Sequence, residues 1–228
     1  MLTHRIRVFF QPIVHIRSGK IAGFEALVRG PVGSDIGPAQ LFAQTPPDRV
    51  PRLECHIAHL AYETIHDRLT ADQFLSINVR PDTLTDEEWL ATIRDLQGKL
   101  DSNRLVVEVT EVVSRNNLTE IIQEVGERCP GLQFAVDDFG AGDASYERIV
   151  EINPRFVKLD LSIIRGIDRL GTHYTTADAA IRFAHGGGID IIAEGVETAQ
   201  EAQVVRELGA DYGQGYFWSR PAPIEQLA

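Results

Sequence analysis

The chain has 228 residues, of which 43% are hydrophobic and 24% charged, as in ordinary soluble globular proteins. Its 33 acidic and 22 basic residues give a net charge of −11, which disfavours a broad binding surface for duplex nucleic acid. No apolar stretch is long enough to span a bilayer, and the two cysteines lack metal-site spacing. We therefore expect a cytoplasmic protein with reduced thiols, no membrane contact and a single domain over residues 1–228.

The N-terminal part predicts a β-hairpin, with strands at 7–14 and 21–29 joined by a Ser-Gly-Lys turn. A segment rich in glycine and proline follows, from 30 to 51, and predicts a loop with a short helix near 38–42. Apolar residues at helical spacing then predict a helix from 53 to about 69.

From residue 74 onward, strands and helices alternate. The predicted strands are 74–79, 105–110, 132–138, 156–160, 189–193 and 214–218, and the predicted helices are 86–100, 118–128, 144–150, 175–185 and 198–208. Strands that are apolar throughout and alternate with helices indicate a parallel sheet covered by helices. Eight strands in all favour an α/β fold of the TIM-type (β/α)8 barrel over an open sheet.

Polar side chains lie in or at the ends of these strands. They are Glu25, Asn78, Glu108, Asp137, Asp138, Lys158, Asp160, Glu194 and Gln214. Each one alone could be a solvated strand end, but in a barrel all of them would converge on one mouth, where catalytic groups lie. The adjacent pair Asp137 and Asp138 is the centre of this pattern, because two neighbouring carboxylates stay ionised most readily beside a bound cation.

The predicted ligands are carboxylate and amide oxygens without cysteine or histidine, which suits Mg²⁺ or Mn²⁺ rather than zinc. So many carboxylates favour two ions with one bridging aspartate, the usual arrangement for attack of water on a phosphodiester. Lys158 and Arg29 would supply positive charge for such a substrate. The Gly140-Ala141-Gly142 turn is also compatible with a dinucleotide fingerprint, but the two preceding aspartates would repel a pyrophosphate, so we reject that interpretation.

Motifs along nearly the whole chain resemble those of the EAL domain family of cyclic di-GMP phosphodiesterases. They are Gln11-Pro12-Ile13, Glu25-Ala26-Leu27-Val28-Arg29, Asn78-Val79, Glu108-Val109-Thr110-Glu111, Asp137-Asp138-Phe139-Gly140, Lys158-Leu159-Asp160, Glu194-Gly195-Val196-Glu197 and Gln214-Gly215-Tyr216. The resemblance implies a TIM-type barrel whose first strand runs antiparallel to the others, and hydrolysis of cyclic di-GMP to linear pGpG with two Mg²⁺ or Mn²⁺ ions and inhibition by Ca²⁺.

The resemblance also implies a role for each matching residue. The metal ligands would be Glu25, Asn78, Glu108, Asp137, Asp138 and Glu194, with Lys158 activating water beside Glu25 and Glu194. Substrate would contact Gln11, Leu27, Arg29, Asp160, Glu197, Gln214 and Trp218, whose indole stands where the family usually has a phenylalanine near a guanine. Glu111 would anchor the loop after Asp138.

The main departure from the family pattern lies in that loop, where Asp143 replaces a tyrosine and Ala144 a serine; Gly30 also replaces a common tryptophan. We expect Asp143 to weaken the positioning of the loop, but no implied metal ligand is lost. An active phosphodiesterase is therefore favoured over a cyclic di-GMP receptor without turnover, and over a scaffold that uses neither site. The family further implies a homodimer and a fused or separate sensor domain.

Overall fold

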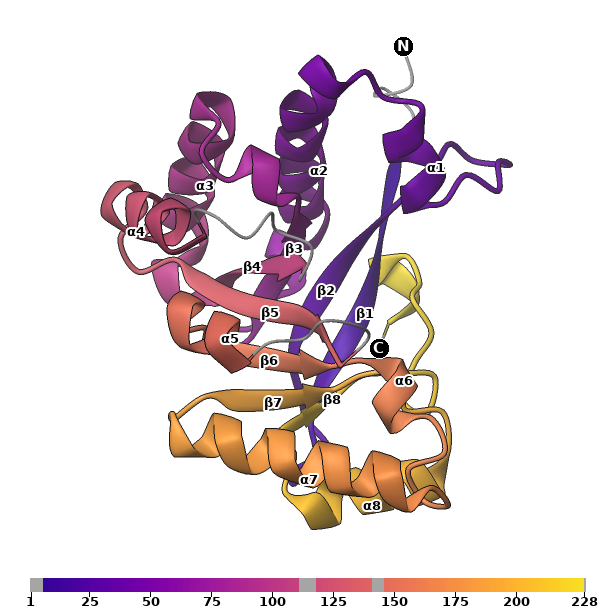
Figure 1. The fold of residues 1–228 in the computed structure, drawn as a ribbon. Helices are drawn as coiled ribbons and strands as arrows, with labels where there is room; N and C mark the ends of the chain where they lie inside the picture. The colour runs from indigo at the N-terminus through magenta and orange to yellow at the C-terminus, as the bar shows by residue number, and fades with distance from the viewer. Residues whose placement is uncertain (1–5, 111–117, 141–145, 228) are drawn as a thin grey trace.

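The computed structural model describes residues 6–110, 118–140 and 146–227 of the chain (Figure 1). Eight strands form a closed barrel in sequence order, β1 to β8, and the helices lie around its outside. The (β/α)8-type barrel predicted from the alternation of strands and helices is therefore confirmed.

The first strand runs against its neighbours. β1 (Arg7–His15) pairs antiparallel with β2 (Ile21–Arg29) and also with β8 (Tyr212–Gly213), while all other neighbouring strands are parallel. This confirms the predicted hairpin and the antiparallel first strand. The hairpin turn includes Gly19, which has a φ of 70°, a conformation that glycine adopts at little cost.

The remaining elements follow the predicted alternation. The other strands are β3 (Phe74–Val79), β4 (Leu105–Thr110), β5 (Gln133–Phe139), β6 (Phe156–Leu159) and β7 (Asp190–Ala193). The helices are α1 (Pro38–Ala43), α2 (Val50–Ile65), α3 (Glu87–Leu100), α4 (Leu118–Arg128), α5 (Tyr146–Ile152), α6 (Leu161–Ile164), α7 (Gly171–Gly186) and α8 (Ala199–Leu208). Short 3₁₀ turns lie at Pro47–Arg49, His66–Arg68, Pro81–Thr83, Ser102–Arg104 and Ile224–Gln226. Among the described residues, no helix is long and apolar enough to cross a membrane.

Sequence analysis misplaced the last strand, missed helix α6 and predicted the start of α7 at 175 instead of Gly171. The last strand was predicted at 214–218 but lies at Tyr212–Gly213. The aromatic residues after Gln214 suggested a strand, but the chain turns at Gly215, where the backbone lies against Val196 and leaves no room for a side chain. Helix α6 was missed because its apolar residues continue the apolar run of β6; the Asp160 carboxylate begins the helix by accepting a hydrogen bond from the Ser162 N–H at 2.8 Å.

An apolar layer fills the barrel at the amino ends of its parallel strands. It consists of Ile13, Phe74, Val106, Ala135, Phe156 and Ile192, all of them buried. A larger cluster lies between the outer faces of the strands and the helices, and it contains both cysteines, Cys55 and Cys129, as buried free thiols. With apolar groups closing one end of the barrel, the opposite end is left for polar side chains.

A carboxylate and lysine cluster at the barrel mouth

The polar residues of the mouth lie directly above the apolar layer, because side chains two residues apart on a strand point to the same side. The sequence repeats this step on five strands, from Phe74 through Ser76 to Asn78, from Val106 to Glu108, from Ala135 to Asp137, from Phe156 to Lys158 and from Ile192 to Glu194. In β1, which runs the other way, Gln11 lies two residues before Ile13. The strand period thus brings the predicted site residues to one end of the barrel.

Lys158 lies at the centre of this cluster and is almost fully buried, with 1% of its side chain exposed. Its Nζ lies 2.5 Å from Glu108 Oε2, 2.8 Å from Glu194 Oε1, 3.0 Å from Asp137 Oδ1 and 3.6 Å from Glu25 Oε2. One ammonium group therefore faces four carboxylates, three from strands β2, β4 and β5 and one from the residue that follows β7.

The carboxylates are oriented by further hydrogen bonds. Glu25 accepts one from Asn78 Nδ2 at 2.8 Å and one from Gln214 Nε2 at 2.7 Å. Glu108 accepts one from Ser76 Oγ at 2.6 Å, a contact that sequence analysis missed although Ser76 is the only polar residue between Phe74 and Asn78 on the same face. With its amide nitrogen donating to Glu25, Asn78 keeps its carbonyl oxygen as a possible metal ligand.

Asp137 and Asp138 are adjacent in β5 and would point to opposite faces of a regular strand. The pairing of β5 with β6 shifts register between Val136 and Phe139, and Asp138 has a φ of 56°, in the left-handed region that aspartate tolerates better than most residues. Ligand oxygens of Asp137, Asp138 and Glu194 consequently lie within 4.8 Å of one another. The irregularity in the strand thus turns two neighbouring carboxylates toward one place.

The cluster is short of positive charge. Burial, together with the nearby Glu25, raises the pKa of Glu108 to about 8, and burial raises the pKa of Glu194 well above its usual range despite Lys158. Burial would lower the pKa of Lys158, but the surrounding carboxylates outweigh it and raise that pKa well above its usual range. The site thus offers only oxygen ligands, and one lysine balances only part of the negative charge of four carboxylates. Both properties fit a hard divalent cation.

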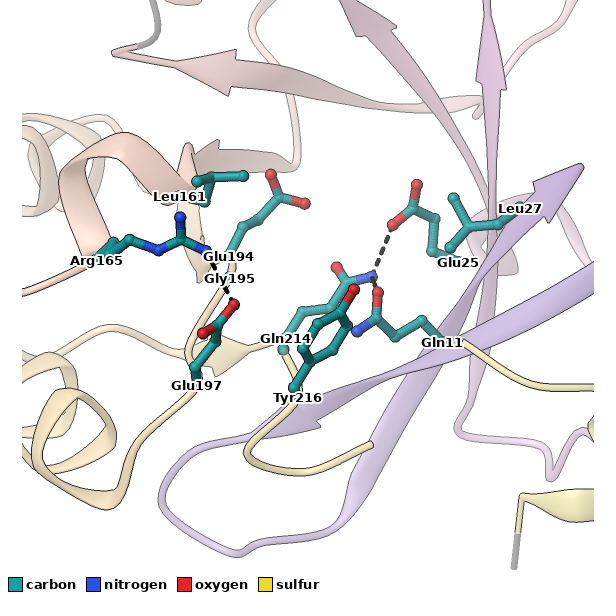
Figure 2. Close-up of a pocket in the computed structure, with 11 residues that line it drawn as sticks. Gln11, Glu25, Leu27, Leu161, Arg165, Glu194, Gly195, Glu197, Gln214 and Tyr216 are labelled. Carbon is teal, nitrogen blue, oxygen red and sulfur yellow. Dashed lines mark hydrogen bonds and ion pairs between the residues drawn. The ribbon is translucent and has the colours of Figure 1, made fainter. Parts of the chain in front are cut away.

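A pocket of about 280 Å³ opens beside the cluster (Figure 2). It is lined by Gln11, Glu25, Leu27, Leu161, Arg165, Glu194, Gly195, Glu197, Gln214, Gly215 and Tyr216. Six of these were predicted substrate or metal residues, whereas sequence analysis missed Leu161, Arg165 and Tyr216 as lining residues. Arg165 and Leu161 escaped notice because they belong to helix α6 and its end.

Three predicted substrate residues are not among those that line the pocket. Arg29 donates to the carbonyl of Val28 at 2.9 Å, and burial lowers its pKa. The Asp160 carboxylate caps α6. The indole of Trp218 lies directly against Gly213. None of Arg29, Asp160 and Trp218 is among the described residues that line the pocket, so their roles toward substrate stay predictions.

Glu111, predicted to anchor a loop, and the unusual Asp143 and Ala144 lie outside the described residues. The predictions made for them therefore stay untested by the structure.

Comparison with known proteins agrees with this geometry. A family model described as the EAL domain matches residues 2–221. Over 237 residues the chain is 29% identical to the probable cyclic di-GMP phosphodiesterase PdeN of Escherichia coli (strain K12), with 96% of this chain and 44% of PdeN covered. The chain thus spans less than half of that relative.

Solved structures show the same fold. The EAL enzyme Bd1971, in its form with bound cAMP and cyclic-di-GMP, has a TM-score of 0.84 and 25% identity over 97% of this chain and 63% of its own. The manganese and cyclic di-GMP complex of Klebsiella pneumoniae BlrP1 has a TM-score of 0.83 and 27% identity over 96% of this chain and 56% of its own. A second structure of BlrP1, its calcium and cyclic di-GMP complex, has a TM-score of 0.84 and 25% identity to this chain.

Proposed function

The chain belongs to the EAL domain family, and from this membership we propose that it hydrolyses cyclic di-GMP to linear pGpG. The observation that carries the proposal is the buried cluster of Glu25, Glu108, Asp137 and Glu194 around Lys158, which opens into a pocket at the carboxyl ends of the strands. Relatives named as probable cyclic di-GMP phosphodiesterases support the choice of substrate.

We propose separate roles in metal binding, water activation and substrate binding for the residues of the site. Glu25, Asn78, Glu108, Asp137, Asp138 and Glu194 would hold two Mg²⁺ or Mn²⁺ ions. When bound, these ions would lower the pKa of a water molecule and neutralise charge on the phosphate. Lys158, held between the carboxylates, would orient that water. Gln11, Leu27, Glu197 and Gln214 line the space into which the substrate would enter.

The test is incubation with cyclic di-GMP and separation of the products by chromatography. We expect pGpG with Mg²⁺ or Mn²⁺ and no turnover with Ca²⁺, because a larger and more flexibly coordinated ion would not hold the close geometry of two ions. Glu25→Ala should abolish turnover, whereas Glu63→Ala, an exposed glutamate on α2, should not. Equal rates with Ca²⁺ and Mg²⁺ would contradict the proposal.

The alternative is a receptor that binds cyclic di-GMP without hydrolysing it. Saturable binding by calorimetry with no pGpG under any of these metals would assign this role.

We also propose that the chain acts as one domain in the cytoplasm, since the family model matches nearly all of it and both cysteines are free thiols. We further propose that a sensor domain, fused or separate, accompanies this domain; the chain covers 44% of its longer relative PdeN.

A further inference from the structure

One wall of the pocket is built from two segments that are far apart in the sequence (Figure 2). Leu161 and Arg165 come from α6 and its end, and Gly195 and Glu197 come from the turn after β7. The segments touch, since a Cβ added at Gly195 would lie 2.4 Å from Leu161 Cβ. Residues 194–198 belong to no helix or strand. The shape of this wall therefore depends on what joins the two segments.

The ion pair between the two segments is too weak to fix them. Arg165 Nη2 lies 3.0 Å from Glu197 Oε1, and the two side chains are 62% and 42% exposed. Exposed pairs of this kind add little stability, because water screens the charges and two long side chains lose freedom. The shape of the wall therefore depends on a contact other than this pair.

Glu201, a buried residue in the first turn of α8, joins the backbones of the two segments. Its Oε1 accepts the N–H of Gly166 at 2.8 Å, and its Oε2 accepts the N–H groups of Glu197 and Thr198 at 3.0 and 3.1 Å. Burial would raise the pKa of Glu201, but these backbone N–H groups outweigh it and lower the pKa. A single carboxylate thus ties the residue after Arg165 to the backbone of Glu197.

Part of this arrangement is an ordinary helix cap. The Thr198 hydroxyl accepts the N–H of Glu201 at 3.1 Å while the Glu201 carboxylate accepts the N–H of Thr198, which is a capping box at the start of α8. A capping box needs one carboxylate oxygen. The bond from Gly166, 35 residues earlier in the chain, uses the other oxygen and is not part of the cap. The second oxygen therefore has a separate role, which is to hold the two segments together.

We propose that Glu201 is a positioning residue for substrate binding, because it holds the loop after α6 against the turn after β7 and so fixes the pocket wall before substrate enters. A wall that is already ordered loses little freedom on binding, whereas a loose wall must be ordered at a loss of affinity. Glu201 is not among the described residues that line the pocket, so it acts through the two segments. The inference rests on the proposed function for the identity of the substrate.

The experiment measures kcat and KM for cyclic di-GMP with Mg²⁺ in Glu201→Gln. Glutamine can still complete a capping box with its amide oxygen. Its NH₂ group would then face the N–H of Gly166, and two donors cannot bond to each other, so the link between the segments is lost. We expect KM to rise about tenfold, the effect of losing one hydrogen bond to a charged group. The value of kcat should stay unchanged, because the substitution leaves the carboxylates around Lys158 in place.

The matched control is Thr198→Ala, which removes the other half of the capping box and leaves the bond from Gly166 to Glu201 in place. It should lower the stability of the chain, as the loss of a helix cap does, without raising KM. The inference is overturned if the two variants raise KM equally, since the cap alone would then explain the effect. It is also overturned if Glu201→Gln lowers kcat and leaves KM unchanged, the pattern of a chain that is partly unfolded.

Failure of the proposed function is separately visible. If the wild-type chain binds cyclic di-GMP without turnover, its dissociation constant, measured by calorimetry, replaces KM in the same comparison. Hydrogen exchange of the Gly166 amide, followed by NMR, tests the link without any substrate. This amide should exchange about tenfold faster in Glu201→Gln than in the wild type or in Thr198→Ala. An exchange rate that is the same in all three proteins would overturn the inference, whatever the chain does with cyclic di-GMP.

Discussion

Lys158 provides the positive charge for four carboxylates inside the barrel. Removing one partner of a buried ion pair usually costs about 3–5 kcal/mol, because charge is left buried without compensation. In the chain without metal, the Lys158 ammonium group thus neutralises part of the carboxylate charge that bound divalent ions would otherwise neutralise.

Replacing Lys158 should therefore make folding depend on metal. We expect Lys158→Met to lower the unfolding free energy of the metal-free chain by about 3 kcal/mol. Addition of Mg²⁺ should then raise the unfolding free energy of the variant more than it raises that of the wild type. Urea unfolding with Mg²⁺ and with EDTA measures both effects. Lys99→Met is the control, since Lys99 pairs with Asp95 on an exposed face of α3. A Lys158→Met chain that gains no more from Mg²⁺ than the wild type would contradict the prediction.

Glu54 is a buried carboxyl group on α2, outside the lining of the pocket. One of its oxygens accepts the Arg80 N–H at 2.9 Å, two residues after Asn78. Burial raises its pKa from 4.5 to about 7, even though this hydrogen bond opposes the shift. A carboxyl whose pKa is higher in the folded state favours folding while protonated, so its contribution to stability falls as pH rises from 4.5 to 7.

Glu54→Gln should remove this pH dependence while keeping an acceptor for the Arg80 N–H. Relative to wild type, the variant should gain about 3 kcal/mol of unfolding free energy between pH 4.5 and pH 8, because the Glu54 pKa rises from 4.5 to about 7 on folding. Other carboxyl groups titrate in both proteins and cancel in this difference. Unfolding in urea at several pH values measures it, with the exposed Glu63→Gln on the same helix as control; parallel pH profiles for wild type and Glu54→Gln would contradict it.

At the scale of elements, the turn after β8 decides where Gln214 lies. Gln214 and Val196 are joined by the hydrogen bond from the Val196 N–H to the Gln214 carbonyl at 3.1 Å, and Phe217 N–H donates to Val196 O at 3.0 Å. Gly215 lies between these bonds with a φ of 152°, and a Cβ there would come within 2.2 Å of Val196 O and 2.4 Å of Val196 N. Backbone atoms cannot move aside as a flexible side chain can.

Gly215→Ala should therefore separate the turn from Val196 and lower the unfolding free energy by about 3 kcal/mol or more, the range of severe local clashes. Gly209→Ala is the control. It also has a positive φ, of 92°, but nothing lies within 4 Å of an added Cβ, so only about 1 kcal/mol of backbone strain is expected. Equal losses in the two variants, measured by urea unfolding, would show that the close approach to Val196 is not what requires glycine.

Sequence analysis predicted best the elements whose apolar residues follow a single clear pattern, either a continuous apolar run or helical spacing. Strands β2, β3 and β4 and helix α4 have the predicted bounds, because apolar runs or helical spacing are bounded by turn residues. Helix α6 was missed because its apolar residues continue the apolar run of β6. The misplaced last strand depends on a tertiary contact, the close approach of Gly215 to Val196. Such close approaches leave no periodic signal.

The same distinction holds for the site. Much of the mouth was predictable, since Glu108, Asp137, Lys158 and Glu194 each lie two residues beyond an apolar residue of the barrel layer. Arg165 and Tyr216 were not, because they come from a helix end and a turn whose position depends on Glu201 and Gly215. The left-handed conformation of Asp138, which brings it toward Asp137 and Glu194, was equally invisible in the residue pattern.

For the whole molecule, exposed apolar side chains lie together on α5 and α7. Tyr146 and Val150 on α5 are 41% and 69% exposed, and Phe183 on α7 is 38% exposed. The rings of Tyr146 and Phe183 are 4.5 Å apart, so these side chains form one continuous patch across two helices. Exposed apolar patches of this kind commonly mark contact with another protein surface.

We predict that this patch joins two copies of the chain, in agreement with the homodimer expected from the sequence. Val150→Asp would place a charge in the centre of the interface and should weaken dimerisation at least tenfold, since an unpaired charge that is buried on association costs well over 1.4 kcal/mol. Val32→Asp is the matched control, because Val32 is even more exposed, at 82%, and lies in the loop after β2. Sedimentation velocity over a concentration series distinguishes the outcomes. A wild-type chain that sediments as a monomer at every concentration, or equal weakening by both substitutions, would show that the patch is not the contact between copies.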